Sequence, residues 1–584
     1  MPGRSRRSTL KTDLLAALLA AVLTAAVAAS FAWSTGIELW HNDGLDYAQI
    51  GREFASGNGL ASRQAIYALH LRFLGEHDLL DQPWPNLHRF PLPALTLGLF
   101  FLLFGATSGV VVAHGITALA ATSGVLHLWA RRALGPWPAV AASALVAFNG
   151  ELFYNVQAGM PEAWVALWVT LALYWLWRPG GPLAPPSSDP VASVDSRKLL
   201  RGALAGAALG LAVLSRTNAV TVVPVLLLAL IPWKQVPWRR MRWKELRQGL
   251  RDDPATRRLL RQRAALGGLL LGGLLLVMAP WMVRNLALTG KPTFSLHTYY
   301  LVPSGAVKGE TKKDYSLRWV RDFVPPLEYA RAHPRALIDK WVHNGEKALR
   351  GYPTFGATFL LAFLPWLAFR RRWGGPLQRT AVVVCGAFVA NALLCNLTDV
   401  NPPRYYYHLL PAMMLVAVAV VQRWTGTARD KSSSRGWGLS LRGVVAAGLL
   451  VVLANPPALA ASLQKVARKG EVRLDLEQMA ALEAATDPDA VIFSDRSAQV
   501  TWYTGRRSVR FHHTRDSKGR RVAAVLELDR DLVPIDAIYL SGPFLDHPKR
   551  GKLWTRLQKR PEFRRLFECQ EPFGDGAVIC RRRG

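Results

Sequence analysis

The chain has 584 residues, of which 51% are hydrophobic, and it carries a formal net charge of +32. Apolar runs alternate with basic loops through residues 1–462, whereas residues 463–584 have the mixed composition of a soluble domain. A nucleic-acid-binding protein would gather its basic residues on one soluble face, so the alternation argues against a nucleic-acid partner. The pattern instead predicts a membrane protein that crosses the bilayer several times.

The N-terminal segment carries the first orientation signal. Basic residues within 4–7 precede an apolar run at 13–33, an arrangement found both in signal peptides and in first spanning helices. Because no clear small-residue cleavage site follows this run, we expect an uncleaved first span whose N-terminus lies inside.

Eleven apolar segments are candidate membrane spans. If they alternate from an inside N-terminus, every long basic loop falls on the inner side, as the positive-inside rule requires. The predicted fold class is therefore mostly α, a polytopic helical bundle of about 11 spans in the cell inner (plasma) membrane. The segments lie near residues 13–33, 109–130, 137–155, 163–178, 201–215, 218–233, 264–283, 354–369, 380–397, 407–422 and 442–462.

Residues 91–105 form a further apolar segment, which is too short for a regular span. A span here would invert every later one and break the charge rule. We therefore expect a helix that lies in the membrane interface or dips into the outer leaflet.

Charged and aromatic residues from distant parts of the chain fall on the predicted outer side. Arginine presents fixed donors that match phosphate oxygens, and a carboxylate can accept a proton from an attacking hydroxyl. Together they predict an external site that binds an anionic lipid and activates an alcohol. The candidate catalytic residues are Asp43, Asp46 and Glu162, and the candidate substrate-binding residues are Tyr47, His88, Arg89, Arg216, Arg284, Asn285, Arg404 and Tyr405.

Four of these residues also have an ordinary structural explanation. Asp43 could cap a helix, and Glu162 could satisfy the first-turn amides of the helix that it begins. Arg284 could anchor a helix end in the interface, and Tyr405 could belong to an aromatic belt. Their occurrence together on one predicted face favours a functional site.

The order of the motifs resembles that of the GT-C membrane glycosyltransferases, in the group of the protein O-mannosyltransferases and lipid A aminoarabinose transferases. The run Asp43-Gly-Leu-Asp46-Tyr47 is similar to the start of that group's first external loop, and Arg89-Phe-Pro-Leu-Pro is similar to its Arg/Lys-Pro-Pro-Leu segment. The resemblance covers roughly residues 13–425. The later matches are Gly159-Met-Pro-Glu162, Leu-Ser-Arg216-Thr, Pro280-Trp-Met-Val-Arg284-Asn285 and Pro403-Arg404-Tyr405.

The chain departs from the family pattern near its first acidic residue. Gly44 stands where a second acidic residue is usual, and Asp46 stands where a Tyr or a neutral residue is common. Phe90 replaces the usual Pro after Arg89. Asp46 is either a substitute for the missing carboxylate or a solvated residue.

The resemblance implies a sugar donor carried on a polyprenyl phosphate, and an acceptor that the sequence does not identify. It implies that Arg89, Arg216, Arg284 and Arg404 bind the donor phosphate, and that Asp43 accepts the proton of the acceptor hydroxyl. A single displacement would invert the anomeric centre. No cofactor is expected, although Asp43, Asp46 and Glu162 together could hold a divalent metal.

Three other functions remain open. An O-antigen ligase or polymerase is a neighbouring enzyme class. A lipid or solute transporter would place ionisable residues near the bilayer midplane, whereas here they gather at the ends of spans. A non-catalytic membrane scaffold would leave binding to the C-terminal domain.

Residues 463–584 are expected to form a small extracytoplasmic α/β domain. Strands are predicted at 490–495 and 535–541, and helices at 475–485 and 552–560. Cys569 and Cys580 flank a turn signal, so that two strands joined there would pair the cysteines in a disulfide, while Cys385 and Cys395 stay free. His512 and His513 are expected on the surface.

Overall fold

The computed structural model describes residues 3–66, 68–81, 83–178, 196–231, 254–301, 326–351, 376–398, 403–429, 476–515, 521–573 and 576–583. The spans expected at 354–369 and 442–462 lie outside these residues.

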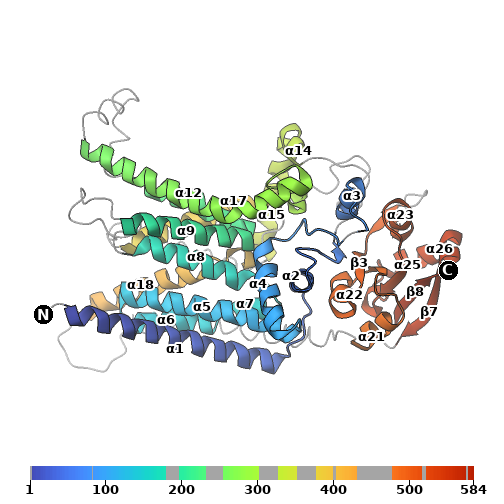
Figure 1. The fold of residues 1–584 in the computed structure, drawn as a ribbon, viewed down its shortest axis with the longest axis horizontal. Helices are drawn as coiled ribbons and strands as arrows, with labels where there is room; N and C mark the ends of the chain where they lie inside the picture. Colours follow the sequence, from blue (N-terminus) through green and yellow to red (C-terminus); the bar gives the residue numbers. More distant parts are fainter. Residues whose placement is uncertain are drawn as a thin grey trace.

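A bundle of long apolar helices forms one half of the molecule, and a small sheet domain lies beyond one end of it (Figure 1). The bundle helices are α1 (Gly3–Thr35), α5 (Ser108–Leu134), α6 (Pro136–Ala147), α7 (Gly150–Gln157), α8 (Glu162–Trp177), α9 (Ser196–Ser215), η1 (Thr217–Thr221), α10 (Val222–Leu230), α12 (Pro254–Thr289), α17 (Pro376–Thr398) and α18 (Leu410–Arg429).

Five helices in the described ranges are long and apolar enough to cross a membrane, and a sixth span results if α6 and α7 count as one broken helix bent by 46°. The break falls at Asn149, whose side chain accepts the Leu152 amide and starts α7 as a new helix. The expected segments at 163–178, 218–233 and 407–422 are present as shorter apolar helices. The count of eleven therefore stays a prediction.

The two ends of the bundle differ in composition. At one end Asp13 near the start of α1 pairs with Arg131 near the end of α5, with Oδ1 and Nε 2.6 Å apart. At the other end the hydroxyl of Ser108, the first residue of α5, donates to Glu38 just after α1. We call these the basic end and the site end. The antiparallel pairing of α1 with α5 agrees with the expected alternation of spans.

Short helices cover the site end. They are α2 (Asn42–Ala55), α3 (Ala68–Glu76), α4 (Pro91–Phe104), η2 (Leu296–Leu301), α14 (Pro326–Ala332), α15 (Pro334–Gly351) and η3 (Pro403–Tyr406).

Helix α4 corresponds to the short apolar segment of the sequence. It packs closely on α2, where a Cβ added at Gly98 would lie 2.9 Å from the carbonyl oxygen of Gly51. Its C-terminal end lies at the site end, because α5 begins there only a few residues later. Its far side exposes Leu99, Leu102 and Phe104. These placements agree with the expected interfacial helix.

The sheet domain contains a six-stranded mixed sheet in the order β1-β3-β2-β6-β8-β7. Strands β1, β3, β2 and β6 run parallel, and β8 and β7 run antiparallel to their neighbours. The strands are β1 (Gln64–Ala65), β2 (Val491–Ser494), β3 (Arg507–Arg510), β6 (Ala537–Leu540), β7 (Phe567–Phe573) and β8 (Ala577–Arg582), with a separate pair formed by β4 (His513–Arg515) and β5 (Arg521–Ala523).

The expected elements of residues 476–583 are largely confirmed. Strands β2 and β6 and helices α21 (Leu476–Ala484) and α25 (Gly551–Gln558) lie where they were predicted, and α22 (Ser497–Thr504), α23 (Val525–Asp531), α24 (Gly542–Leu545) and α26 (Pro561–Leu566) complete the domain.

The structure confirms the predicted cysteine pairing but not the predicted exposure of His512. Cys569 and Cys580 form the predicted disulfide between β7 and β8, and Cys385 and Cys395 form no disulfide, as predicted. His512 is buried, contrary to expectation, and its carbonyl accepts the amide of Ala524, the N-cap residue of α23. The side chain of His513 lies outside the described part of the structure.

Strand β1 comes from the loop between α2 and α4, far in sequence from the rest of its sheet. Side chains of this loop, including Ala65, Leu71 and Trp84, share one buried apolar cluster with Phe493 and Val509 of the sheet domain. The first loop and the sheet domain therefore pack as one unit over the site end.

Candidate functional site

The site begins at the N-terminus of α2. His41 caps the helix, because its Nδ1 accepts the amide of Asp43 at 3.1 Å. Gly44 follows, and a Cβ there would run into the backbone of Ala158 and Gly159 in the turn before α8. This close approach explains why a second acidic side chain is missing at position 44. The same contact places the first turn of α2, which carries Asp43, next to the turn between α7 and α8.

Asp43 is paired with two arginines from distant segments. Its Oδ1 lies 2.7 Å from Nη2 of Arg89, and its Oδ2 lies 3.2 Å from Nη2 of Arg404. Burial alone would raise the pKa of this carboxyl, but Arg89, Arg404, His41 and Arg216 together hold the pKa well below its usual range. The carboxylate keeps 21% of its surface exposed and is thus open to a ligand.

Asp46 lies one helical turn further and is fully buried. Its Oδ2 accepts Nε of Arg89 at 2.5 Å and contacts Nε2 of His88 at 2.8 Å, while its Oδ1 accepts Nε2 of Gln49 at 3.0 Å. Burial would raise the pKa of Asp46, but His88 and Arg89 hold the pKa far below the usual range. With no exposed surface, this anion acts on its neighbours rather than on a ligand.

Arg89 joins the two aspartates and is itself tightly held. Asn86 accepts the Arg89 amide at 2.9 Å and donates to the Arg89 carbonyl at 2.9 Å, which fixes the backbone. The guanidinium lies over the Tyr47 ring, with Cζ 5.3 Å from the ring centroid. Burial would lower the pKa of Arg89, but Asp43 and Asp46 raise it well above the ordinary value. Burial also raises the pKa of Tyr47 to about 12, so the phenol stays neutral.

A second cluster lies beside Asp43. Glu162 at the start of α8 forms an ion pair with Nη1 of Arg216, at the end of α9. The Arg216 guanidinium stacks over the Tyr405 ring at 5.1 Å, and that of Arg404 lies 5.6 Å from the same ring. The Tyr405 carbonyl accepts the side-chain amides of Asn218 and Asn391, which fixes η3. The Tyr405 ring thus contacts the guanidinium groups of both Arg216 and Arg404.

Arg284 and Asn285 lie near the end of α12, and Arg284 contacts the first loop at Leu60. Arg284 donates to the Leu60 carbonyl at 3.4 Å and to Asn285 Oδ1 at 3.2 Å, and its guanidinium stacks on Trp281 at 4.6 Å. Asn285 donates to the Phe294 carbonyl. These contacts fit an anchor for the first loop, beside the cluster around Asp43.

Sequence reasoning missed several residues of the site. His297 in η2 is half-buried, with its ring centroid 6.5 Å from that of His88, and desolvation together with Arg89 and His88 lowers its pKa to about 3. Gln49 was also missed, although a polar side chain three residues after Asp46 lies on the same helix face and can bond to its carboxylate. No pattern in the sequence marks His297.

A divalent metal was considered for the three carboxylates. In the part of the chain that the structure describes, no group of three or more His, Cys, Asp or Glu side chains has a metal-binding arrangement. Asp43, Asp46 and Glu162 instead face arginines.

The site thus offers a partly exposed carboxylate between two cations, with Arg216 and a second carboxylate close by. Such a set can bind an anion through Arg89 and Arg404 and place a proton acceptor next to it.

Comparisons with known proteins agree with this arrangement. Residues 15–250 match the family model described as dolichyl-phosphate-mannose-protein mannosyltransferase. The structure is similar to that of ArnT from Cupriavidus metallidurans bound to undecaprenyl phosphate, with a TM-score of 0.53 and 14% identity over 96% of this chain and 97% of ArnT.

A second solved structure has the same fold. The archaeal oligosaccharyltransferase AglB from Archaeoglobus fulgidus, in complex with an inhibitory peptide and a dolichol-phosphate, has a TM-score of 0.52 and 14% identity over 98% of this chain and 74% of AglB. No curated protein sequence matches the chain. The resemblance to the GT-C glycosyltransferases is confirmed by the family model and by the fold, and the apolar helices agree with a multi-pass membrane protein.

Proposed function

We propose that this chain is an integral-membrane glycosyltransferase that moves a sugar from a polyprenyl-phosphate donor to the hydroxyl of a lipid, glycan or protein on the outer face of the membrane. The observation that carries the proposal is the exposed edge of Asp43 between Arg89 and Arg404. The similar proteins support the donor class. The ArnT structure is bound to undecaprenyl phosphate, the AglB structure is in complex with a dolichol-phosphate, and the matching family is described as dolichyl-phosphate-mannose-protein mannosyltransferase.

The reaction follows from the arrangement of charges. The acceptor oxygen attacks the anomeric carbon, the bond from that carbon to the phosphate oxygen breaks, and the acceptor proton passes to Asp43. Polyprenyl phosphate leaves with the electron pair, and its growing charge is stabilised by Arg89 and Arg404. One displacement from the face opposite the leaving group inverts the anomeric centre.

Donor binding would also tune the base. In the free site the arginines hold the pKa of Asp43 well below its usual range, which makes the carboxylate a weak base. A donor phosphate that binds Arg89 and Arg404 cancels part of their field and places a negative charge nearby, and both effects raise the pKa of Asp43. The carboxylate would thus become a better proton acceptor only when a donor is present.

The other candidate residues take supporting roles. Asp46 holds Arg89 and is itself bonded to His88, and Glu162 holds Arg216, which would be a further ligand of the donor phosphate. Arg284 acts indirectly, by holding the loop at Leu60.

The orientation is part of the proposal. Arg131 and Arg132 lie at the basic end, where the positive-inside rule favours the cytoplasm. The disulfide between Cys569 and Cys580 in the sheet domain favours an oxidising compartment at the site end.

Transfer from a defined donor tests the proposal. The purified chain in lipid nanodiscs would receive synthetic polyprenyl phosphates that carry different labelled sugars, together with envelope lipids, glycans and proteins as acceptors. We expect the label to move to one acceptor class with inversion, as read from the product anomer by NMR. Release of polyprenyl diphosphate, in place of the monophosphate, would favour an O-antigen ligase or polymerase.

A transporter is separated from an enzyme by a second measurement. Liposomes containing the chain would be scored for movement of labelled lipid or solute across the bilayer, with and without acceptor. Movement without any change in covalent structure would overturn the proposal.

A further inference from the structure

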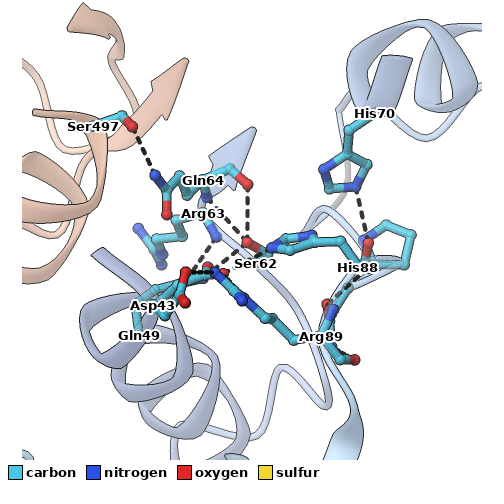
Figure 2. A network of polar contacts seen from close by, with 12 residues as sticks. Asp43, Gln49, Ser62, Arg63, Gln64, His70, His88, Arg89 and Ser497 are labelled. Carbon is cyan, nitrogen blue, oxygen red and sulfur yellow. Dashed lines mark hydrogen bonds and ion pairs between the residues drawn. The ribbon is translucent and has the colours of Figure 1, made fainter. Parts of the chain in front are cut away.

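A buried hydrogen-bonded chain links Ser497 of the sheet domain to Gln49 (Figure 2), and Gln49 in turn bonds to Asp46. Nε2 of Gln64 in β1 donates to Oγ of Ser497 in α22 at 2.6 Å. The hydroxyl of Ser62 donates to the Gln64 carbonyl at 3.0 Å and accepts Nε2 of Gln49 at 2.8 Å. The same Nε2 donates to Oδ1 of Asp46 at 3.0 Å. We call Gln49, Ser62, Gln64 and Ser497 the relay.

The relay leaves little freedom to Gln49. Its side chain is fully buried, and its Oε1 accepts the Arg63 amide at 2.9 Å. Because Asp46 is an anion and needs donors, the NH₂ group of the amide must face it. The neighbours Ser62, Gln64 and Ser497 are also buried. Buried hydrogen-bonded networks of this kind fix geometry, since each unmade bond costs the full desolvation of its group.

The sheet domain holds α2 at a second place. Arg52 in the last turn of α2 donates to the carbonyls of Thr501 and Trp502 at 2.8 Å each, and its guanidinium stacks on the Trp502 ring at 5.1 Å. Helix α2 is therefore bonded to α22 near its C-terminal end, and its middle is bonded to the sheet domain through the relay. Its first turn, which carries Asp43, precedes both of these contacts.

We infer that Gln49 is a positioning residue, and that the seating of β1 in the C-terminal sheet sets the placement of Asp46 and Arg89 through the relay. The inference rests on the proposed function, in which Arg89 binds the donor phosphate. Strand β1 is held by β3, since the Ser508 amide donates to the Arg63 carbonyl at 2.8 Å. The sheet domain thus acts on the lipid site without touching the lipid.

Removal of single relay bonds tests the inference. Gln49→Leu, Ser62→Ala and Ser497→Ala would be compared in transfer assays in nanodiscs with the labelled donor. We expect the donor KM to rise about 10-fold or more, because small displacements of a binding group have large effects, while the acceptor KM stays within about 2-fold. Ser497→Thr keeps the hydroxyl and should restore the donor KM. A donor KM equal to that of the wild type in Gln49→Leu, Ser62→Ala and Ser497→Ala would overturn the inference.

A matched control and a double-mutant cycle exclude a general loss of structure. Ser143→Ala removes a buried serine hydroxyl from α6, which bonds to Ala139, Val140 and His127 within the bundle. It should leave the donor KM unchanged. Gln49→Leu combined with Ser497→Ala should cost less than the product of the single effects, because both break one relay. Multiplicative effects would show two independent sites and contradict the relay.

Hydrogen exchange separates this inference from the proposed function. Amides of residues 42–55 should exchange faster in Ser497→Ala than in the wild type or in Ser143→Ala, since the relay no longer holds α2. If the wild type transfers no sugar from any polyprenyl phosphate, the proposed function fails, and faster exchange would still support the relay. Unchanged exchange in Ser497→Ala would overturn the relay even in an active enzyme.

Discussion

Arg89 donates through Nη2 to Oδ1 of Asp43 at 2.7 Å, across 46 residues of sequence. The same guanidinium donates through Nε to the buried Asp46 at 2.5 Å. One planar group therefore joins a partly exposed carboxylate to one without solvent access. The buried end fixes the direction of the guanidinium, and the exposed end is where a phosphate can compete with Asp43.

Asp43→Asn should remove most of the transfer activity. The amide keeps the size of the carboxylate but cannot accept the acceptor proton, and loss of a general base typically lowers the rate by about 10²–10⁴. Turnover per folded molecule in nanodiscs, with saturating donor, is the measurement. Membrane insertion and yield should change little, because the side chain is partly exposed.

The chain contains a close control for this variant. Asp13 also lies between two arginines, with Arg131 Nε at 2.6 Å and Arg132 Nε at 3.6 Å, and it is 20% exposed, but it lies at the basic end. Asp13→Asn should keep wild-type turnover. Similar turnover in both variants would refute the role of Asp43 as the base. Transfer that persists in Asp43→Asn but is lost in Asp46→Asn would move that role to Asp46.

Arg89→Lys should damage donor use much more than Arg284→Lys. A lysine keeps the charge, yet its single ammonium cannot reproduce the fork that spans two carboxylates. We expect the donor KM to rise at least about 10-fold for Arg89→Lys and further for Arg89→Ala, in line with a charge-assisted contact. Arg284→Lys should stay within about 3-fold, because the Leu60 carbonyl needs only one donor. A larger effect at Arg284 would place its side chain on the phosphate.

Asp46→Asn should lower stability in a pH-dependent way. Breaking a buried ion pair costs about 3–5 kcal/mol, because Arg89 loses its buried partner. The pKa of Asp46 lies far below its unfolded value, so its contribution is fully present above about pH 4 and is lost as the pH falls towards the folded pKa. Thermal unfolding in detergent should therefore show a gap to wild type that is constant at neutral pH and narrows under acid conditions. A gap that widens below pH 4 would reverse this sign.

Much of the candidate site was visible in the sequence. Motif order brought together Asp43, Arg89, Glu162, Arg216 and Arg404, and the structure places all of them at one end of the bundle. Helix periodicity and loop charge found α1, α5, α9, α12 and α17, since long apolar runs carry a strong signal.

Other features left no local signal. Strand β1 has only two residues, and its side-chain partner Ser497 follows Gln64 by 433 positions, so neither periodicity nor spacing could reveal the pairing. The role of Arg284 as a phosphate ligand stays a prediction from a motif, which gives residue order but not side-chain direction. In the structure its guanidinium turns to Trp281 and the Leu60 carbonyl.

Gly44→Ala should disturb the start of α2. The added Cβ would run into the Ala158 carbonyl and lie 3.1 Å from Gly159 Cα, and backbone atoms cannot yield as a flexible side chain can. We expect a loss of about 1–3 kcal/mol in stability and reduced turnover, because Asp43 shifts with the helix. Gly272→Ala in α12 is the control, since nothing lies within 4 Å of its added Cβ. A wild-type melting temperature in both variants would exclude the close approach of Gly44 to Ala158 and Gly159.

Cys569→Ser should destabilise the sheet domain in the oxidised protein. The disulfide closes an 11-residue separation between β7 and β8, and its loss should cost about 2–3 kcal/mol by removing a constraint on the unfolded chain. Cys395→Ser, which removes a bundle thiol that forms no disulfide, should leave melting of the sheet domain unchanged. Without prior reduction, a maleimide should label Cys385 and Cys395 in unfolded protein taken from cells, and Cys569 and Cys580 only after reduction. Labelling of all four before reduction would mean that this domain faces a reducing compartment, and the proposed outer location of the site would fall with it.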